Sequence, residues 1–134
     1  MMDKIFNNVS IGFGIVAGAV TWMFGEWNMA LCALLAIMTI DYITGIIKAV
    51  YTKTVSSGIG FKGILKKFSI LMIVVLANII QKLLGGGLAI REIVIMFYVA
   101  NEGISILENV ASISTKMPQA LKDILLQLRE RNTK

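Results

Sequence analysis

Histidine is absent from this 134-residue chain, and cysteine and proline occur once each. Without histidine, the chain has no Ser–His–Asp triad, no Cys–His pair and no histidine-bound metal. The single cysteine, Cys32, has no partner for an internal disulfide and lies in an apolar run, where a thiol behaves as a small hydrophobic side chain. We therefore expect a protein that is not an enzyme and that has no catalytic residue, metal site or cofactor.

Charged residues are scarce at 16% of the chain, whereas a soluble domain carries about 25%. Hydrophobic residues make up 57% and gather in long runs. A helix needs about 20 mostly apolar residues to cross the roughly 30 Å hydrocarbon layer of a membrane. The sequence therefore predicts an all-α membrane protein whose transmembrane helices are Ile5–Phe24, Trp27–Ala49, Phe68–Leu84 and Leu88–Val110.

The net charge of +5 comes from basic residues that gather near the ends of these runs. In a bundle of four transmembrane helices, eleven of the thirteen fall on one side, and Lys82 and Arg91 fall on the other. Cytoplasmic loops of membrane proteins carry such an excess. We therefore expect both termini in the cytoplasm, and no nucleic-acid partner. If the first run lay in the interface, the bundle would have three helices and the N-terminus would change sides.

The first run shows two further features. Asp3 offsets Lys4, and no good small-residue cleavage site follows the run, so we expect it to be retained rather than removed as a signal peptide. Small residues at four-residue spacing let helix backbones approach closely, which makes this run a candidate helix-packing face. These residues are Ser10, Gly14 and Gly18.

Residues 51–67 form the longest interruption between runs. Apolar residues at helical spacing from Phe61 to Phe68 lie opposite lysines, which is typical of a short helix on an anionic membrane surface. A lysine-rich linker is the alternative, because Gly60 and Gly63 weaken a helix. The basic residues expected at the membrane surface, here and in the tail, are Lys62, Lys66, Lys67, Lys122, Arg129 and Arg131.

The tail carries a second amphipathic pattern. Pro118 can begin a helix, because proline fits the first helical turn. Leu121, Ile124, Leu125 and Leu128 then form an apolar stripe, which predicts docking on the membrane surface or on another chain. We therefore expect a transmembrane domain over residues 1–115 and a basic, amphipathic cytoplasmic helix within residues 116–134.

Polar side chains recur at helical spacing inside three of the runs. An ionised group such as Asp41 or Glu102 costs at least ~2.5 kcal/mol in hydrocarbon, so it faces protein or water. Two interpretations remain open: hydrogen bonds between helices of one chain, or the wall of a pore built by several copies, with the fourth run as the preferred wall. Lys48 shares a helix face with Asp41 as a candidate partner. The stripe residues are Asp41, Thr44, Lys48, Asn78, Gln81, Asn101, Glu102, Ser105 and Glu108.

Four segments together resemble a known family. They are DYITGIIKAV (Asp41–Val50), the lysine-rich Lys62–Lys67, FYVANEGISILENV (Phe97–Val110) and MPQALKDILLQLRE (Met117–Glu130). In this order they are similar to the phage-lysis and toxin-secretion holins of Gram-positive bacteria and their phages. The chain departs from that pattern in having Gln81 where an acid is frequent and in lacking a second proline near Pro118.

The resemblance implies a non-enzymatic protein of the bacterial cytoplasmic membrane that oligomerises in the bilayer. At a set time it would form lesions that release an endolysin, or a toxin that lacks a signal peptide. Its partners would then be lipid, copies of itself and the released protein. Two other classes remain open: a small ion- or proton-coupled channel or transporter subunit that uses Asp41 and Glu102, and a membrane scaffold.

Overall fold

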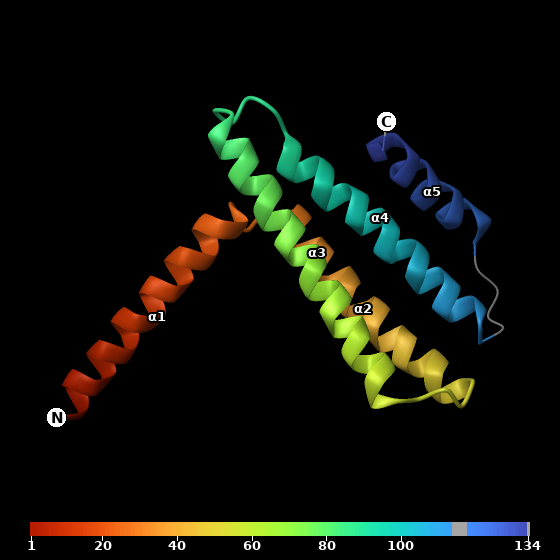
Figure 1. The fold of residues 1–134 in the computed structure, drawn as a ribbon, viewed down its shortest axis with the longest axis horizontal. Helices are drawn as coiled ribbons and strands as arrows, with labels where there is room; N and C mark the ends of the chain where they lie inside the picture. The colour runs from red at the N-terminus through yellow and green to blue at the C-terminus, as the bar shows by residue number, and fades with distance from the viewer. Residues whose placement is uncertain (114–117, 134) are drawn as a thin grey trace.

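The computed structural model describes residues 1–113 and 118–133, which form five helices and no strand. The first four are each long and apolar enough to cross a membrane (Figure 1). This confirms the predicted all-helical architecture with four membrane-length helices. The helices are α1 (Met2–Phe24), α2 (Met29–Tyr51), α3 (Ser57–Leu83), α4 (Ile90–Ala111) and α5 (Gln119–Thr133).

Side-chain caps set the start of α2 and of α3. Asn28 accepts a hydrogen bond from the Leu31 amide at 3.2 Å, and the Ser56 hydroxyl accepts one from the Ile59 amide at 3.1 Å. Such caps satisfy amide groups that have no partner inside the helix. Helix α3 begins at Ser57 and runs unbroken for 27 residues. The helix predicted from Phe61 to Phe68 is therefore confirmed and the linker alternative is wrong, but the helix is not short: it is the first part of a membrane-length helix.

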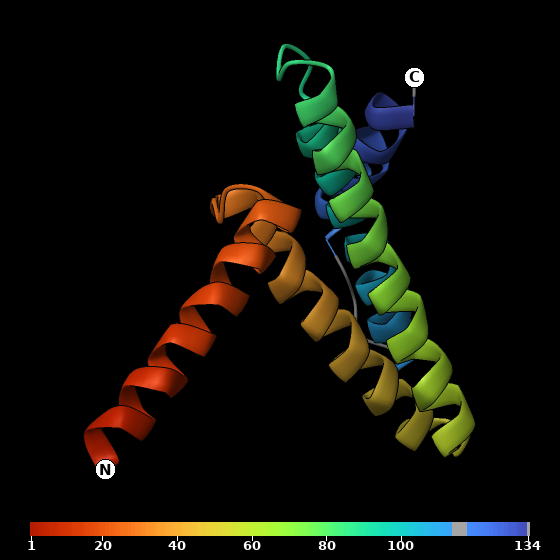
Figure 2. The same cartoon turned by 60° about the vertical axis from the view of Figure 1, so that its left-hand side comes forward.

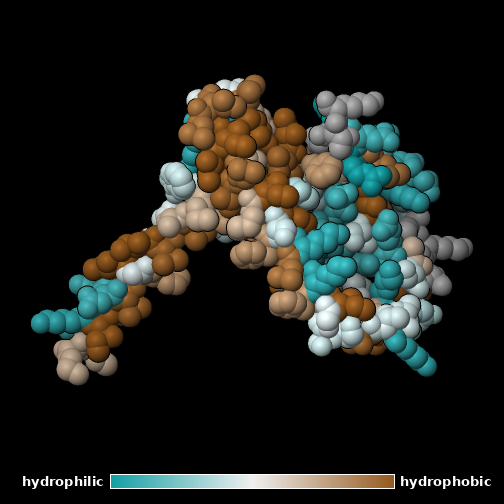
Figure 3. Space-filling model, viewed as in Figure 1, coloured by the Kyte–Doolittle hydropathy of each residue, from teal (hydrophilic) through white to brown (hydrophobic). Residues whose placement is uncertain are grey.

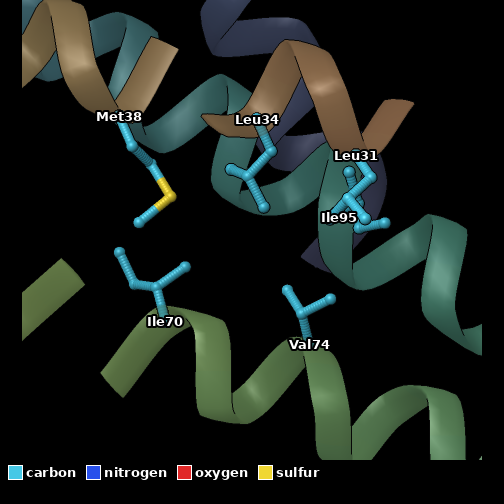
Figure 4. Close-up of a cluster of buried hydrophobic side chains, with 6 residues drawn as sticks. All are labelled: Leu31, Leu34, Met38, Ile70, Val74 and Ile95. Carbon is cyan, nitrogen blue, oxygen red and sulfur yellow. The ribbon is translucent and has the colours of Figure 1, made fainter. Parts of the chain in front are cut away.

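Three helices, α2, α3 and α4, share one apolar core (Figure 4). Its side chains converge from all three helices, as the spacing of apolar residues along each helix requires. This packing makes α2–α4 the bundle on which the polar residues are placed. The fully or largely buried members are Leu31, Leu34, Met38, Ile70, Val74 and Ile95.

Helix α1 diverges from the bundle and touches it near its own C-terminal end (Figures 1 and 2). None of its residues is buried. A Cβ atom added at Gly14 or Gly18 would meet nothing within 4 Å. The predicted packing face of α1 therefore has no partner within the described chain, and its role between chains stays a prediction.

Three side chains donate hydrogen bonds to the C-terminal end of α1: Asn78, Lys82 and Arg91. Carbonyl groups in the last turn of a helix lack partners within it, and the negative end of the helix dipole favours cations there. The α1–α2 turn and the start of α4 therefore lie at the same end of the bundle. The acceptors are the carbonyl oxygens of Trp22, Met23, Phe24 and Glu26, at 2.5 to 3.0 Å.

Helix α5 runs antiparallel beside α4, folded back along it (Figure 1). The predicted apolar stripe of α5 is split in this arrangement. Leu125 and Leu128 are half-buried, whereas Leu121 and Ile124 are exposed. The helix itself is present as expected, and its placement in the cytoplasm stays a prediction.

We predict that Gly25→Ala loosens the corner between α1 and the bundle. Gly25 has φ +81°, and a Cβ there would lie 2.6 Å from Asn78 Oδ1. Alanine at such a position destabilises by more than about 1 kcal/mol. Thermal unfolding in detergent and limited proteolysis at the turn measure the effect. Gly14→Ala is the matched control, because it is mid-helix in open space and should stabilise slightly. Equal stability of Gly25→Ala and the parent protein would contradict the prediction.

Candidate functional site

Three charged side chains meet inside the bundle. The Lys67 ammonium lies 2.6 Å from Asp41 Oδ2 and 2.5 Å from Glu102 Oε2. The side chains of Lys67, Asp41 and Glu102 are 16%, 12% and 5% exposed. One cation from α3 therefore bridges a carboxylate from α2 and another from α4. We call these three residues the charged cluster.

The chain places the three residues at one depth. Asp41 lies ten residues before the end of α2, Lys67 ten residues after the start of α3, and Glu102 nine residues before the end of α4. At 1.5 Å per residue, each is about 14–15 Å from the same end of the bundle. Because successive helices alternate in direction, these offsets bring the charges together near the middle of the helices.

Asn109 extends the charged cluster along α4. Its amide nitrogen donates hydrogen bonds to Asp41 Oδ1 and to the Thr44 hydroxyl, both at 3.0 Å. Across the described residues, every buried side-chain nitrogen and oxygen has a hydrogen-bond partner. Complete pairing of this kind avoids the large cost of an unsatisfied polar group in a low-dielectric interior. Sequence reasoning missed Asn109, although its position seven residues after Glu102 puts it on the same helix face.

Lys67 corrects two predictions. It was expected at the membrane surface with Lys62 and Lys66, but those two are exposed and Lys67 is not. The carboxylate of Asp41 also pairs with Lys67 rather than with Lys48. The physical reason is the length of α3: its early start moves Lys67 from a flank to the middle of a helix. Because Lys67 lies inside the bundle, only ten of the eleven basic residues counted for the cytoplasmic side can lie there.

Four other residues of the polar stripe lie in two places away from the charged cluster. Gln81 lies at the other end of the bundle, where its side-chain oxygen accepts a hydrogen bond from the Arg91 amide at 2.8 Å. Asn78 is also there, bound to α1. Asn101 and Glu108 instead are exposed on the outside of α4. The stripe is thus partly interhelical hydrogen bonding and partly an unburied polar face.

A cavity of about 250 Å³ lies between α2 and α3 beside the charged cluster. Asp41, Lys67 and Ser105 line one part of it, and Val55 and Ser56 of the α2–α3 loop line another. Since a liquid water molecule occupies about 30 Å³, several could fit. Two carboxylates facing one ammonium also leave one excess negative charge, which could hold a proton or a monovalent cation. Within residues 1–113 and 118–133, no group of acidic, histidine or cysteine side chains is arranged to bind a metal.

Comparison with known proteins decides the family. Residues 18–130 match the bacteriophage holin family. The chain belongs to that family. The resemblance seen in the sequence is thereby confirmed, and membership together with four membrane-length helices indicates a non-enzymatic, multi-pass membrane protein.

Relatives of this holin-family chain come from bacteria and a phage. An uncharacterized 14.9 kDa protein of Clostridium perfringens is 39% identical over 131 residues, covering 97% of this chain and 99% of the relative. An uncharacterized protein of Listeria monocytogenes is 40% identical over 125 residues, covering 93% and 87%. A probable holin of Bacillus phage phi105 is 36% identical over 104 residues, covering 78% and 76%. No solved structure matches this chain.

We predict that Lys67→Met strongly destabilises the bundle. It would leave Asp41 and Glu102 buried without their cation, and breaking a buried ion pair in this way costs about 3–5 kcal/mol. Unfolding in detergent, followed by circular dichroism, measures the loss. Lys66→Met is the control: Lys66 is the adjacent residue and its side chain is exposed, so this substitution should change stability little. Replacing all three members of the charged cluster with leucine should restore much of the stability. If Lys67→Met unfolds like Lys66→Met, the charged cluster does not hold the bundle together.

Proposed function

We propose that this protein is a holin that oligomerises in the bacterial cytoplasmic membrane and opens lesions for timed release of a protein from the cell. The released protein is an endolysin, or a toxin that lacks a signal peptide. The observation that carries the proposal is the family match over residues 18–130, a span that includes the whole charged cluster and α2–α4. The phage relative described as a probable holin supports the same function.

The distribution of polar groups is compatible with a subunit that first accumulates and then assembles. The charged cluster is paired inside the chain, so it needs no second copy to enter a membrane. Asn101 and Glu108 are exposed on α4, where lipid cannot satisfy a carboxylate or an amide. Contact with water or with other copies would satisfy them. We therefore attribute the drive for oligomerisation to these two residues, because an assembly can shield them from lipid, for example by turning them toward an enclosed aqueous path.

A channel or transporter subunit is the second candidate. The excess carboxylate of the charged cluster and the adjoining cavity favour it, because together they could take up a proton or a cation. Such a protein would move small ions and retain macromolecules. Release of a cytoplasmic enzyme therefore separates the two candidates.

We predict abrupt lysis when the protein is expressed in bacteria with an endolysin that has no export signal. Without the endolysin, growth should stop and the membrane potential should fall, while turbidity stays constant. Asn101→Leu/Glu108→Leu should insert normally but delay or abolish lysis, because α4 no longer needs a partner other than lipid. Asn101→Gln/Glu108→Gln, which keeps both positions polar, is the control and should lyse. Ion leakage without enzyme release would instead identify a channel.

We also predict the topology. The bias of basic residues places the N-terminus and the α2–α3 loop in the cytoplasm, and the Gly85–Gly87 turn outside. Cysteines introduced at Ser56 and at Gly87, in a Cys32→Ser background, should react with a membrane-impermeant maleimide from opposite sides. Both are exposed in loops or turns, so each serves as the control for the other. Labelling of both from one side would show that α3 does not cross.

A further inference from the structure

Helix α5 lies against the middle of α4. A Cβ atom added at Gly103 would be 3.0 Å from Leu125 Cδ2, so this glycine allows the two helices to approach closely. Gly103 is eight residues from the end of α4 at Ala111, a rise of about 12 Å. When α4 spans a membrane in this arrangement, Leu125 and much of α5 lie at the depth of the hydrocarbon.

The composition of α5 is incompatible with lipid at that depth. Five of its fifteen residues are charged, and hydrocarbon cannot solvate ionised side chains. Figure 3 shows hydrophilic surface over α4 and α5, next to hydrophobic surface on the rest of the bundle. Asn101 and Glu108 of α4 are exposed as well. The exposed polar residues of α5 are Gln119, Lys122, Asp123, Gln127, Glu130 and Arg131.

We propose that α5 folds back along α4 inside the assembled lesion and that its outer side lines the aqueous path. This rests on the proposed holin function and names the surface that faces the water. The lining then includes Asp123 and Gln127 of α5 beside the exposed polar residues of α4. It replaces the expectation of a tail that stays in the cytoplasm or on the membrane surface.

The surface next to α5 in the assembly belongs to a second copy of this chain. Leu121 and Ile124 of α5 are 45% and 54% exposed, because α4 covers a different part of the helix. In an aqueous path these two apolar side chains would face water. An adjacent copy, seated along this edge of α5, would bury them and close the wall between subunits.

A disulfide that locks α5 onto α4 tests the arrangement. Gly103→Cys/Leu125→Cys in a Cys32→Ser background places the sulfur atoms near each other, and shortening Leu125 removes the contact that a Cβ at Gly103 would meet. The protein is reconstituted in vesicles of phosphatidylethanolamine and phosphatidylglycerol that contain a fluorescent dextran. Oxidised vesicles should still release the dextran, as reduced ones do. Each single-cysteine variant is a control for the effect of oxidation.

Modification of the lining provides a second measurement that leaves the α4–α5 contact intact. Gln127→Cys, exposed on α5, should react with a charged methanethiosulfonate reagent and change its conductance in planar bilayers by a small, measurable step, because a path that passes dextran is much wider than one adduct. Ile43→Cys, exposed on α2 and apolar, is the matched control at a lipid-facing position and should keep its current.

The outcomes separate this inference from the function on which it rests. Absence of dextran release from the Cys32→Ser parent overturns both. Release by the parent, together with loss of release in the oxidised lock that reduction restores, shows that α5 must leave α4 and overturns the inference alone. Reaction of Gln127→Cys without a change in current shows that α5 lies outside the path, which also overturns it. Sustained release by the locked protein, together with a change in current when Gln127→Cys is modified, supports it.

Discussion

The pairing of Asp41 and Glu102 with Lys67 at the middle of the helices constrains the whole bundle. A carboxylate at that depth needs a cation and hydrogen bonds from protein, because hydrocarbon offers neither. Lys67 supplies the cation to both, and Asn109 adds hydrogen bonds to Asp41. These contacts fix how far α2, α3 and α4 are shifted along one another and which side of each helix faces the other two. The apolar core can then pack in a single arrangement around them.

The opposite end of the bundle is organised by backbone groups instead. There the carbonyl oxygens at the end of α1 accept hydrogen bonds from Asn78, Lys82 and Arg91. Arg91 is 2% exposed, so its charge is satisfied almost entirely by protein oxygen atoms. The result is an α1 helix that is held at one end while its length projects from the bundle (Figure 2). That length is available to lipid or to another subunit.

The two sides of the bundle differ in the solvent that they can accept. Much of the exposed surface of α1, α2 and α3 is apolar, which suits lipid. The side that carries α5 is rich in charge and suits water (Figure 3). A single molecule with one apolar side and one charged side is poorly solvated within a bilayer. A ring of copies could present the apolar side to lipid and the charged side to an enclosed aqueous path. This asymmetry supports the proposed formation of lesions by the protein.

The sequence by itself determined the helical class, the four membrane-length helices and the family, because long apolar runs and the segment Phe97–Val110 are local features. It also identified Asp41 and Glu102 as residues that lipid could not accept. It did not reveal their partner, because Lys67 and the carboxylates are 26 and 35 residues apart and meet through antiparallel packing. Once the start of α3 is known, Lys67 lies at the same distance from the end of the bundle as Asp41 and Glu102, which would have indicated it as their partner. The tertiary structure decided that register, the fastening of α1 and the position of α5, because each depends on contacts between distant segments.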